Sequence, residues 1–168
     1  MERLAEHFEL ILFTASNKFY AKEIIKLIDP KQTLISYALF REHCYRTEHN
    51  LYIKDLRILN RDLKSILIVD NSVISFAFQL DNGIPILPFY DSMNDEELVK
   101  VTNHIMALKD LKDVRAGNRE GFGLQQMYNL NAARFLRYYE EEPVKVCNVD
   151  NELDKLKISL PTYLAKVR

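Results

Sequence analysis

The sequence predicts an α/β fold, a parallel sheet flanked by helices, on two observations. Three short apolar runs, "FELILF" (8–13), "SILIV" (65–69) and "GIPILPF" (83–89), have the continuous apolar character of buried parallel strands. Segments with helical periodicity separate or follow these runs, and strands that alternate with helices are typical of α/β proteins. The prolines of the third run place it near an edge of the sheet.

Two segments are predicted to be helices that cover the sheet. Segment 17–29, "NKFYAKEIIKLID", stops at Pro30, and "NDEELVKVTNHIMALKD" begins with Asn94 as N-cap and Glu97 in the capping-box position. The apolar faces are expected to be Phe19, Ile24, Leu27 and Ile28 in the first helix, and Leu98, Val101, Ile105 and Leu108 in the second.

Region 33–64 is less regular. "LISYALF" is compatible with a strand, and "HNLYIKDLRIL" with a turn, a short strand and a loop. Three of the 4 glycines lie within or beside "AGNREGFG", the best candidate for a boundary. We therefore expect a domain over 1–115 and a mainly helical C-terminal extension over 116–168, whose aromatic residues suit a docking surface better than a cofactor site.

Composition excludes some classes of partner. With 23 basic and 24 acidic residues, the net charge of −1 gives no basic surface for nucleic acid or membrane. Cys44 and Cys147 stand alone, as in a reduced intracellular compartment. No apolar run reaches the roughly 18 residues of a membrane span, and the first residues lack a signal-peptide core. A soluble protein of the cytoplasm or nucleus is expected.

Polar residues follow two of the predicted strands, where ligands bind in open parallel sheets. Thr14, Ala15 and Ser16 follow the first strand and precede a helix, so hydroxyls, backbone N–H groups and the helix dipole could bind an anion. They could equally well only cap the helix.

Asp70 and Asn71 follow "SILIV" and offer oxygen ligands suited to Mg²⁺. Lys54 in "YIKDL" could add a cation for phosphate. The alternatives are an Asx turn at the strand end, and a solvated surface pair between Lys54 and Asp55. His43 and Cys44 also suggest a nucleophile, but no oxyanion donor or orienting acid accompanies them in the sequence.

Several segments in order, "FELILFTASNKFYAKEIIKLIDP", "LFREHC", "YIKDLRILNRDL", "ILIVDNS" and "NGIPILPFYDSMNDEEL", resemble the FCP/SCP-type phosphatases of the haloacid dehalogenase superfamily. The likeness extends over about residues 4–115 and is nearest to the CTD small phosphatase-like 2 branch. It implies a Rossmannoid parallel sheet and Mg²⁺-dependent dephosphorylation of phosphoserine or phosphothreonine in proteins, in particular the RNA polymerase II C-terminal tail in the nucleus.

The resemblance also implies roles for individual residues. Thr14 corresponds to the phosphate-binding hydroxyl, within the segment that includes Ala15 and Ser16. Arg41 of "LFREHC" is expected to contact the substrate, and Lys54 to balance the phosphate charge. Asn71 is expected to bind the metal directly, with Asp70 as a metal-site and catalytic support.

Three departures from the family pattern stand out. Val73 follows "DNS" where proline is usual, and Asn17 replaces an apolar residue that holds a substrate proline in tail-specific enzymes, which weakens the expectation of that specificity. The third is the motif DxDxT/V, whose first aspartate attacks phosphorus and whose second acts as general acid and base; it is absent from these 168 residues. Asp150 and Glu152 are a weak substitute for this acidic pair.

The strand that carries this motif lies at the centre of the family sheet, between the strands that end at Thr14 and Asp70. The sequence therefore predicts an incomplete phosphatase domain, which needs a strand from elsewhere or leaves backbone groups unpaired. Two functions remain open: an enzyme that contributes the phosphate, lysine and metal half of its site, and an inactive module that binds a phosphopeptide or protein. The mitochondrial import-receptor branch of the same fold is a third, less favoured alternative.

Overall fold

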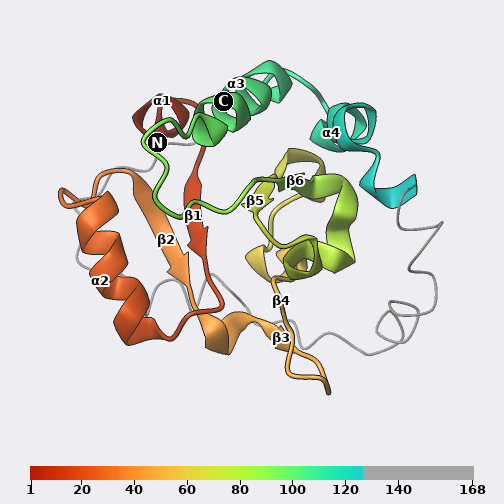
Figure 1. The fold of residues 1–168 in the computed structure, drawn as a ribbon. Helices are drawn as coiled ribbons and strands as arrows, with labels where there is room; N and C mark the ends of the chain where they lie inside the picture. Colours follow the sequence, from red (N-terminus) through yellow and green to blue (C-terminus); the bar gives the residue numbers. More distant parts are fainter. Residues whose placement is uncertain (127–168) are drawn as a thin grey trace. The chain divides into compact units, whose positions relative to one another are not determined.

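The computed structural model describes residues 1–126 (Figure 1), and these fall into two compact units, the first ending at Lys54 and the second beginning at Asp55. The predicted α/β class is confirmed by small parallel sheets flanked by helices. Unit 1 contains α1 (Glu2–Ala5), β1 (Leu10–Phe13), α2 (Lys18–Ile28), β2 (Ile35–Leu39), the 3-10 turn η1 (Arg41–His43), β3 (Tyr45–Arg46) and β4 (Tyr52–Ile53). Unit 2 contains η2 (Leu56–Leu59), η3 (Leu63–Ser65), β5 (Ile68–Asp70), η4 (Val73–Asn82), β6 (Gly83–Pro85), α3 (Glu97–Leu108) and α4 (Val114–Phe122).

In unit 1, β1 pairs with β2 in parallel, and β3 with β4 as an antiparallel hairpin. Helix α2 packs on the β1–β2 sheet, as Figure 1 shows, through a small core around Ala21, Ile25 and Phe40. The predicted apolar face of this helix is wrong. Phe19 and Leu27 are exposed, because the helix turns Ala21 and Ile25, one turn apart, toward the sheet.

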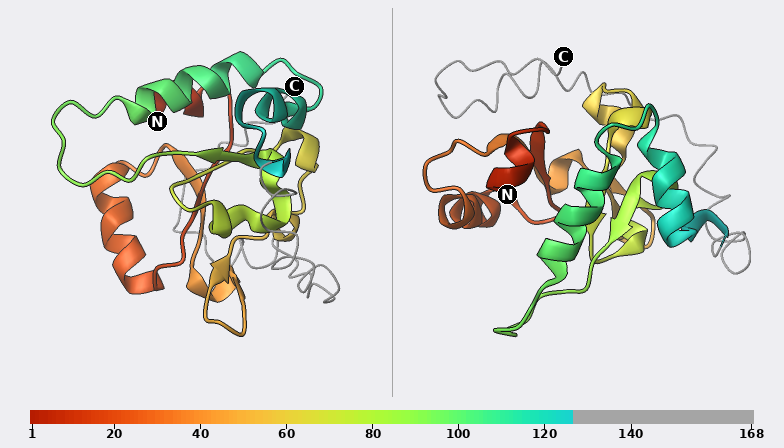
Figure 2. Two further views of the ribbon diagram at one scale, coloured as in Figure 1. Left: turned by 45° about the vertical axis from the view of Figure 1, so that its right-hand side comes forward. Right: turned by 90° about the horizontal axis from the view of Figure 1, so that it is seen from above.

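In unit 2, β5 pairs with β6 in parallel, so the predicted strands in "SILIV" and "GIPILPF" are confirmed. The first starts later than predicted, at Ile68, and the second ends earlier, at Pro85. Segment 56–59, predicted as loop, is the 3-10 turn η2. Helix α4 packs against η4 and β6, and both views of Figure 2 place it beside them. Gly117 of α4 lies so close to Leu108 of α3 that a Cβ atom would clash with it.

Most of the predicted apolar face of α3 is confirmed, because Val101, Ile105 and Leu108 are buried. Leu98, the fourth member, is exposed. The N-cap at Asn94 is wrong: the helix begins two residues later, and the Asp95 carboxylate accepts a hydrogen bond from the Glu97 N–H (2.9 Å). An acidic side chain thus binds the first turn, as the helix dipole favours.

Asp29 ends α2 and starts the approach to β2. Its side chain is 1% exposed, and its two oxygens accept hydrogen bonds from the N–H groups of Thr33, Leu34 and Ile35 (2.9–3.0 Å). Burial by itself raises the pKa of Asp29, but these bonds and one from Gln32 outweigh it, so the pKa lies below its ordinary 3.8. The carboxylate fixes the connection that brings β2 beside β1.

The expected domain boundary at 115/116 lies within α4 and remains a prediction. The rest of the expected C-terminal extension, with Cys147, Asp150 and Glu152, lies outside the described residues. Among residues 1–126, no helix has the length and hydropathy of a bilayer-spanning segment.

Candidate functional site

Thr14, Ala15 and Ser16 form a short loop between β1 and α2. The N–H of Thr14 donates to the carbonyl of Leu39 (3.0 Å), which extends the β1–β2 ladder to the edge of the loop. The N–H of Ser16 donates to Oγ1 of Thr14 (3.1 Å), so the loop closes on its own hydroxyl. The three residues are half-buried. The loop thus holds a hydroxyl and consecutive N–H groups in one fixed turn.

Asn17 caps α2. Its side chain accepts a hydrogen bond from the N–H of Tyr20 (2.9 Å). Of the alternatives considered for Thr14 and Ser16, capping of this helix therefore belongs to Asn17. The cap gives a physical reason for asparagine at position 17.

Arg41 joins this loop from η1. Its Nε donates to the carbonyl of Ala15 (2.6 Å), and its backbone N–H donates to the carbonyl of Ser16 (3.0 Å). The guanidinium also lies over the ring of Tyr52, 5.3 Å from its centroid. The structure thus brings together four of the predicted site residues, and it adds Tyr52, which the sequence interpretation missed. Alternation in "YIK" places Tyr52 and Lys54 on one side of the strand, the only sequence signal for it.

His43 and Cys44 lie beside the same loop in structural roles. Nδ1 of His43 accepts from the N–H of Phe40 (2.9 Å), and Sγ of Cys44 contacts the carbonyl oxygens of Thr14 and Phe40 (both 3.9 Å). These contacts hold the turn between β2 and β3. They give no support to the nucleophile interpretation.

Lys54 directly follows β4 and is 9% exposed, and Asp55 is 2% exposed. This burial excludes the solvated surface pair considered from the sequence. Asp55 instead accepts a bidentate pair of bonds from Arg57 (Nε to Oδ1 2.9 Å, Nη2 to Oδ2 2.7 Å) and one from Nε2 of Gln79 (3.0 Å). The hydrogen bonds that Arg57 donates to the Asp55 carboxylate raise the pKa of Arg57. Asp55 therefore anchors the start of unit 2.

Asp70 ends β5 and is 8% exposed, and Asn71 after it is exposed. Oδ1 of Asp70 accepts from the N–H of Ser72 (2.8 Å), the contact of the Asx turn that was the alternative interpretation. The N–H of Ile86 donates to the Asp70 carbonyl (3.2 Å), which continues the β5–β6 ladder. The end of β5 is thus fixed both by its side chain and by its backbone.

The pair fits part of a magnesium site. A carboxylate and an amide are oxygen ligands of the kind that Mg²⁺ takes, and Mg²⁺ in proteins often keeps waters and few carboxylates. Within residues 1–126 no group of three or more His, Cys, Asp or Glu side chains could hold a metal ion by itself. A complete site would need further ligands, such as a phosphate oxygen.

Comparison with known proteins places the chain in a family. Residues 1–115 match the family model "NLI interacting factor-like phosphatase". The chain is 45% identical over 126 residues to CTD small phosphatase-like protein 3 of Caenorhabditis elegans, covering 74% of this chain and 44% of that protein. It is 42% identical over 127 residues to CTD small phosphatase-like protein 2 of Dictyostelium discoideum, covering 76% and 22%.

A third relative carries a different name. The chain is 38% identical over 114 residues to the mitochondrial import inner membrane translocase subunit TIM50 of Candida glabrata, covering 67% of this chain and 23% of that protein. The chain thus spans less than half the length of each of these relatives. The family match nevertheless covers more than half of the 168 residues, and the chain belongs to the NLI interacting factor-like phosphatases, the FCP/SCP type of the haloacid dehalogenase superfamily.

Proposed function

We propose that this chain carries the phosphate, lysine and metal half of a protein serine/threonine phosphatase of the CTD small-phosphatase type. Phosphatases of this type are in general metal-dependent and act on phosphoproteins. The observation that carries the proposal is the Thr14–Ser16 loop, where the Thr14 hydroxyl and Arg41 are held at the same turn. Such groups bind the oxygens of a phosphate monoester.

Each residue has a role in this proposal. The Thr14 hydroxyl and the Ala15 N–H bind phosphoryl oxygens, and Arg41 binds the substrate phosphate. Lys54 offsets negative charge where it is partly withdrawn from water, which strengthens its interaction with an anion. Asp70 and Asn71 would hold Mg²⁺, which would supply Lewis-acid neutralisation of negative charge.

The attacking aspartate belongs to a segment outside these 168 residues, because they contain no DxDxT/V. The strand arrangement supports this. Among the described residues, β1 has β2 as its single strand neighbour and β5 has β6, although both are aliphatic strands of the kind found inside sheets. A strand bearing the motif, from the same polypeptide or another, would supply the nucleophile and general acid.

A second candidate is a phosphopeptide-binding module without turnover. The same loop and Arg41 favour it, since neither requires a nucleophile. Magnesium as the metal, the RNA polymerase II tail as the substrate and the nucleus or cytoplasm as the location are parts of the proposal. The relative named as a mitochondrial translocase subunit keeps the import-receptor branch as the competing assignment of location.

The test is complementation of turnover. The 168-residue chain is assayed with Mg²⁺ on p-nitrophenyl phosphate and on a phosphoserine peptide, alone and fused behind a segment that bears a DxDxT/V motif. We expect no turnover by the chain alone and Mg²⁺-dependent turnover by the fusion. Thr14→Ala and Asp70→Asn should each lower kcat of the fusion by roughly 10²-fold or more, as loss of a transition-state contact does.

Matched controls separate site effects from folding. Thr102→Ala removes a hydroxyl that bonds only within α3, and Asp91→Asn changes an exposed carboxylate, so both fusions should keep wild-type turnover. Turnover by the chain alone that disappears on Thr14→Ala would contradict the half-site and direct the search to Asp150. A fusion that binds phosphopeptide but never turns it over would favour the binding module.

A further inference from the structure

Arg41 is held from two directions within unit 1. Its Nε donates to the Ala15 carbonyl at 2.6 Å, and its guanidinium lies over the Tyr52 ring, 5.3 Å from the centroid. The two contacts come from different segments, the loop after β1 and the β3–β4 hairpin. The side chain of Arg41 therefore links the hairpin to the loop.

The hydrogen bond from Nε places a constraint on the loop. Together with the bond from the Arg41 N–H to the Ser16 carbonyl (3.0 Å), it fixes the carbonyls of two consecutive loop residues. Once these carbonyls are held by Arg41, the N–H groups of the same turn are held in a defined direction. The Ser16 N–H then meets Oγ1 of Thr14 at 3.1 Å.

Because Nε of Arg41 is bonded to the Ala15 carbonyl, the Nη atoms are the ones that can donate to a phosphate. Within residues 1–126 the guanidinium is not in an ion pair with a carboxylate, and its Nη atoms are the donors not engaged by Ala15. Arg41 is solvent-exposed, where a long side chain samples several rotamers unless it is held. Stacking on an aromatic ring is a common way to hold a guanidinium plane while it donates at its edge.

We propose that Tyr52 is a positioning residue for phosphate binding: its ring holds the Arg41 guanidinium, which in turn fixes the Thr14–Ser16 loop. This inference rests on the proposed function, because it assigns Tyr52 a role at the same site. Tyr52 suits this role because β4 pairs it with Arg46 of β3, which fixes its backbone in the hairpin. The ring, and not the phenol hydroxyl, is the part that acts.

The experiment measures binding of a phosphoserine peptide, against its unphosphorylated form, by the full 168-residue chain. Tyr52→Leu should weaken phosphopeptide binding by roughly 3- to 5-fold, the size expected for an exposed cation–π contact, and Tyr52→Phe should retain it. Arg41→Lys should weaken binding by roughly 10-fold or more. Tyr20→Leu removes an exposed tyrosine ring from α2 in the same unit and should have no effect.

A double variant separates positioning from general stability. If Tyr52 acts through Arg41, Arg41→Lys/Tyr52→Leu should bind no more weakly than Arg41→Lys alone, whereas independent effects would add. In the NMR spectrum, the Arg41 Nε–H signal should shift and exchange faster with water in Tyr52→Leu, but not in Tyr52→Phe. Additive losses, or an Nε–H signal unchanged by Tyr52→Leu, would overturn the inference.

The outcomes also separate this inference from the proposed function. Binding that is lost in Thr14→Ala but unchanged in Tyr52→Leu would overturn the role of Tyr52 and leave the phosphate loop in place. Failure of the wild-type chain to prefer the phosphorylated peptide would contradict the proposed phosphate site itself. The Nε–H signal of Arg41 would still decide in that case whether Tyr52 positions the guanidinium.

Discussion

Two polar regions of the molecule use similar side chains in opposite ways. In the Thr14–Ser16 loop of unit 1, half-buried residues hold a turn through bonds to one another and to the exposed Arg41. In unit 2, the amides of Asn82 and Asn118 are 2% exposed and bond to backbone carbonyls. The buried amides bond to the backbone and hold the fold. The part-exposed groups in the fixed turn of unit 1 remain accessible to a ligand.

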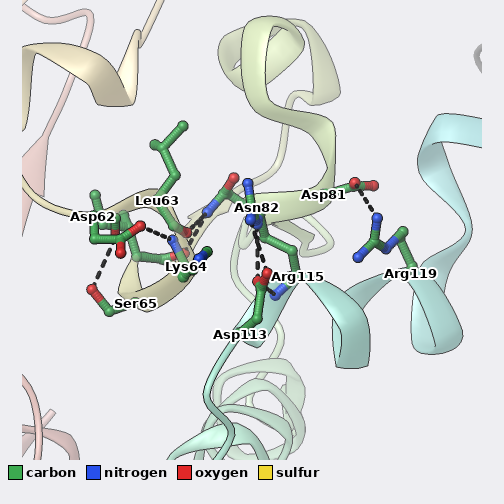
Figure 3. Close-up of polar contacts among 10 residues, drawn as sticks. Asp62, Leu63, Lys64, Ser65, Asp81, Asn82, Asp113, Arg115 and Arg119 are labelled. Carbon is green, nitrogen blue, oxygen red and sulfur yellow. Dashed lines mark hydrogen bonds and ion pairs between the residues drawn. The ribbon is translucent and has the colours of Figure 1, made fainter.

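Figure 3 shows Asn82 and its neighbours in unit 2. Asn82 donates to the carbonyls of Leu63 (2.6 Å) and Ile66 (2.8 Å), which fixes η3 beside the end of η4. Asn118 donates to the carbonyls of Asp81 (3.1 Å) and Gly83 (3.4 Å). Since these two bonds identify its nitrogen, its Oδ1 accepts from Nε2 of His104 (3.0 Å).

The largest expected effect comes from breaking this buried network. Asn118→Ala leaves the carbonyls of Asp81 and Gly83 and the ring of His104 without that partner, and should lower the free energy of unfolding by about 2–4 kcal/mol. Urea unfolding measures the change, and exposed Asn94→Ala serves as the control. If Asn118→Ala cost no more than its control, the network would not hold the fold.

A somewhat smaller loss is expected from crowding the same region. A Cβ atom on Gly83 would overlap the ring of Phe76, which is completely buried. Gly83→Ala should therefore destabilise the protein by about 1–3 kcal/mol in thermal or urea unfolding. Gly121→Ala meets only the edge of the His104 ring, at 3.3 Å, and is the matched comparison. Equal stability of the two variants would contradict the tight packing of β6 on η4.

Unit 1 also contains a buried side chain that bonds to the backbone, namely Asp29. Its substitution tests whether such groups hold the fold in unit 1 as they do in unit 2. Asp29→Asn should cost about 1–3 kcal/mol at neutral pH, because an amide cannot accept all the N–H bonds of Asp29. The lowered pKa means that the stabilisation is complete above the unfolded-state pKa near 3.8 and disappears as pH falls through the folded-state pKa. The difference from wild type should therefore narrow in acid; a difference that is constant with pH would contradict this origin.

The smallest effect is expected at Asp113, a part-exposed carboxylate that has no ligand role in this account. The hydrogen bond from Arg115 is the main cause that lowers its pKa to about 2 (Nη2 to Oδ2 2.8 Å), as drawn in Figure 3. In an NMR titration, Arg115→Gln should raise the Asp113 pKa toward 3.8, and Arg119→Gln should raise it less. An equal rise in both variants would show that long-range charge, not this contact, sets the pKa.

The strands and the polar residues at their ends could be predicted because aliphatic runs and strand-end hydroxyls or carboxylates are local features. The face of α2 could not, because Phe19 and Leu27 are as apolar as Ile25, and packing on the sheet decides among them. The start of α3 could not be predicted either, because both Asn94 and Asp95 can accept a hydrogen bond from the first turn, and the structure uses Asp95, which accepts from the Glu97 N–H. Tyr52 required the tertiary approach of the β3–β4 hairpin to Arg41.

The central claim is that the Thr14–Ser16 loop, and not the buried amide network, binds phosphate. Titration of the isotope-labelled chain with a phosphoserine peptide, followed by NMR, tests it directly. We expect saturable shifts of the Ala15 and Ser16 amides and of Arg41 Nε–H, with little change in the side-chain amides of Asn82 and Asn118. Absence of saturable shifts in the loop, or equal shifts with the unphosphorylated peptide, would contradict the account.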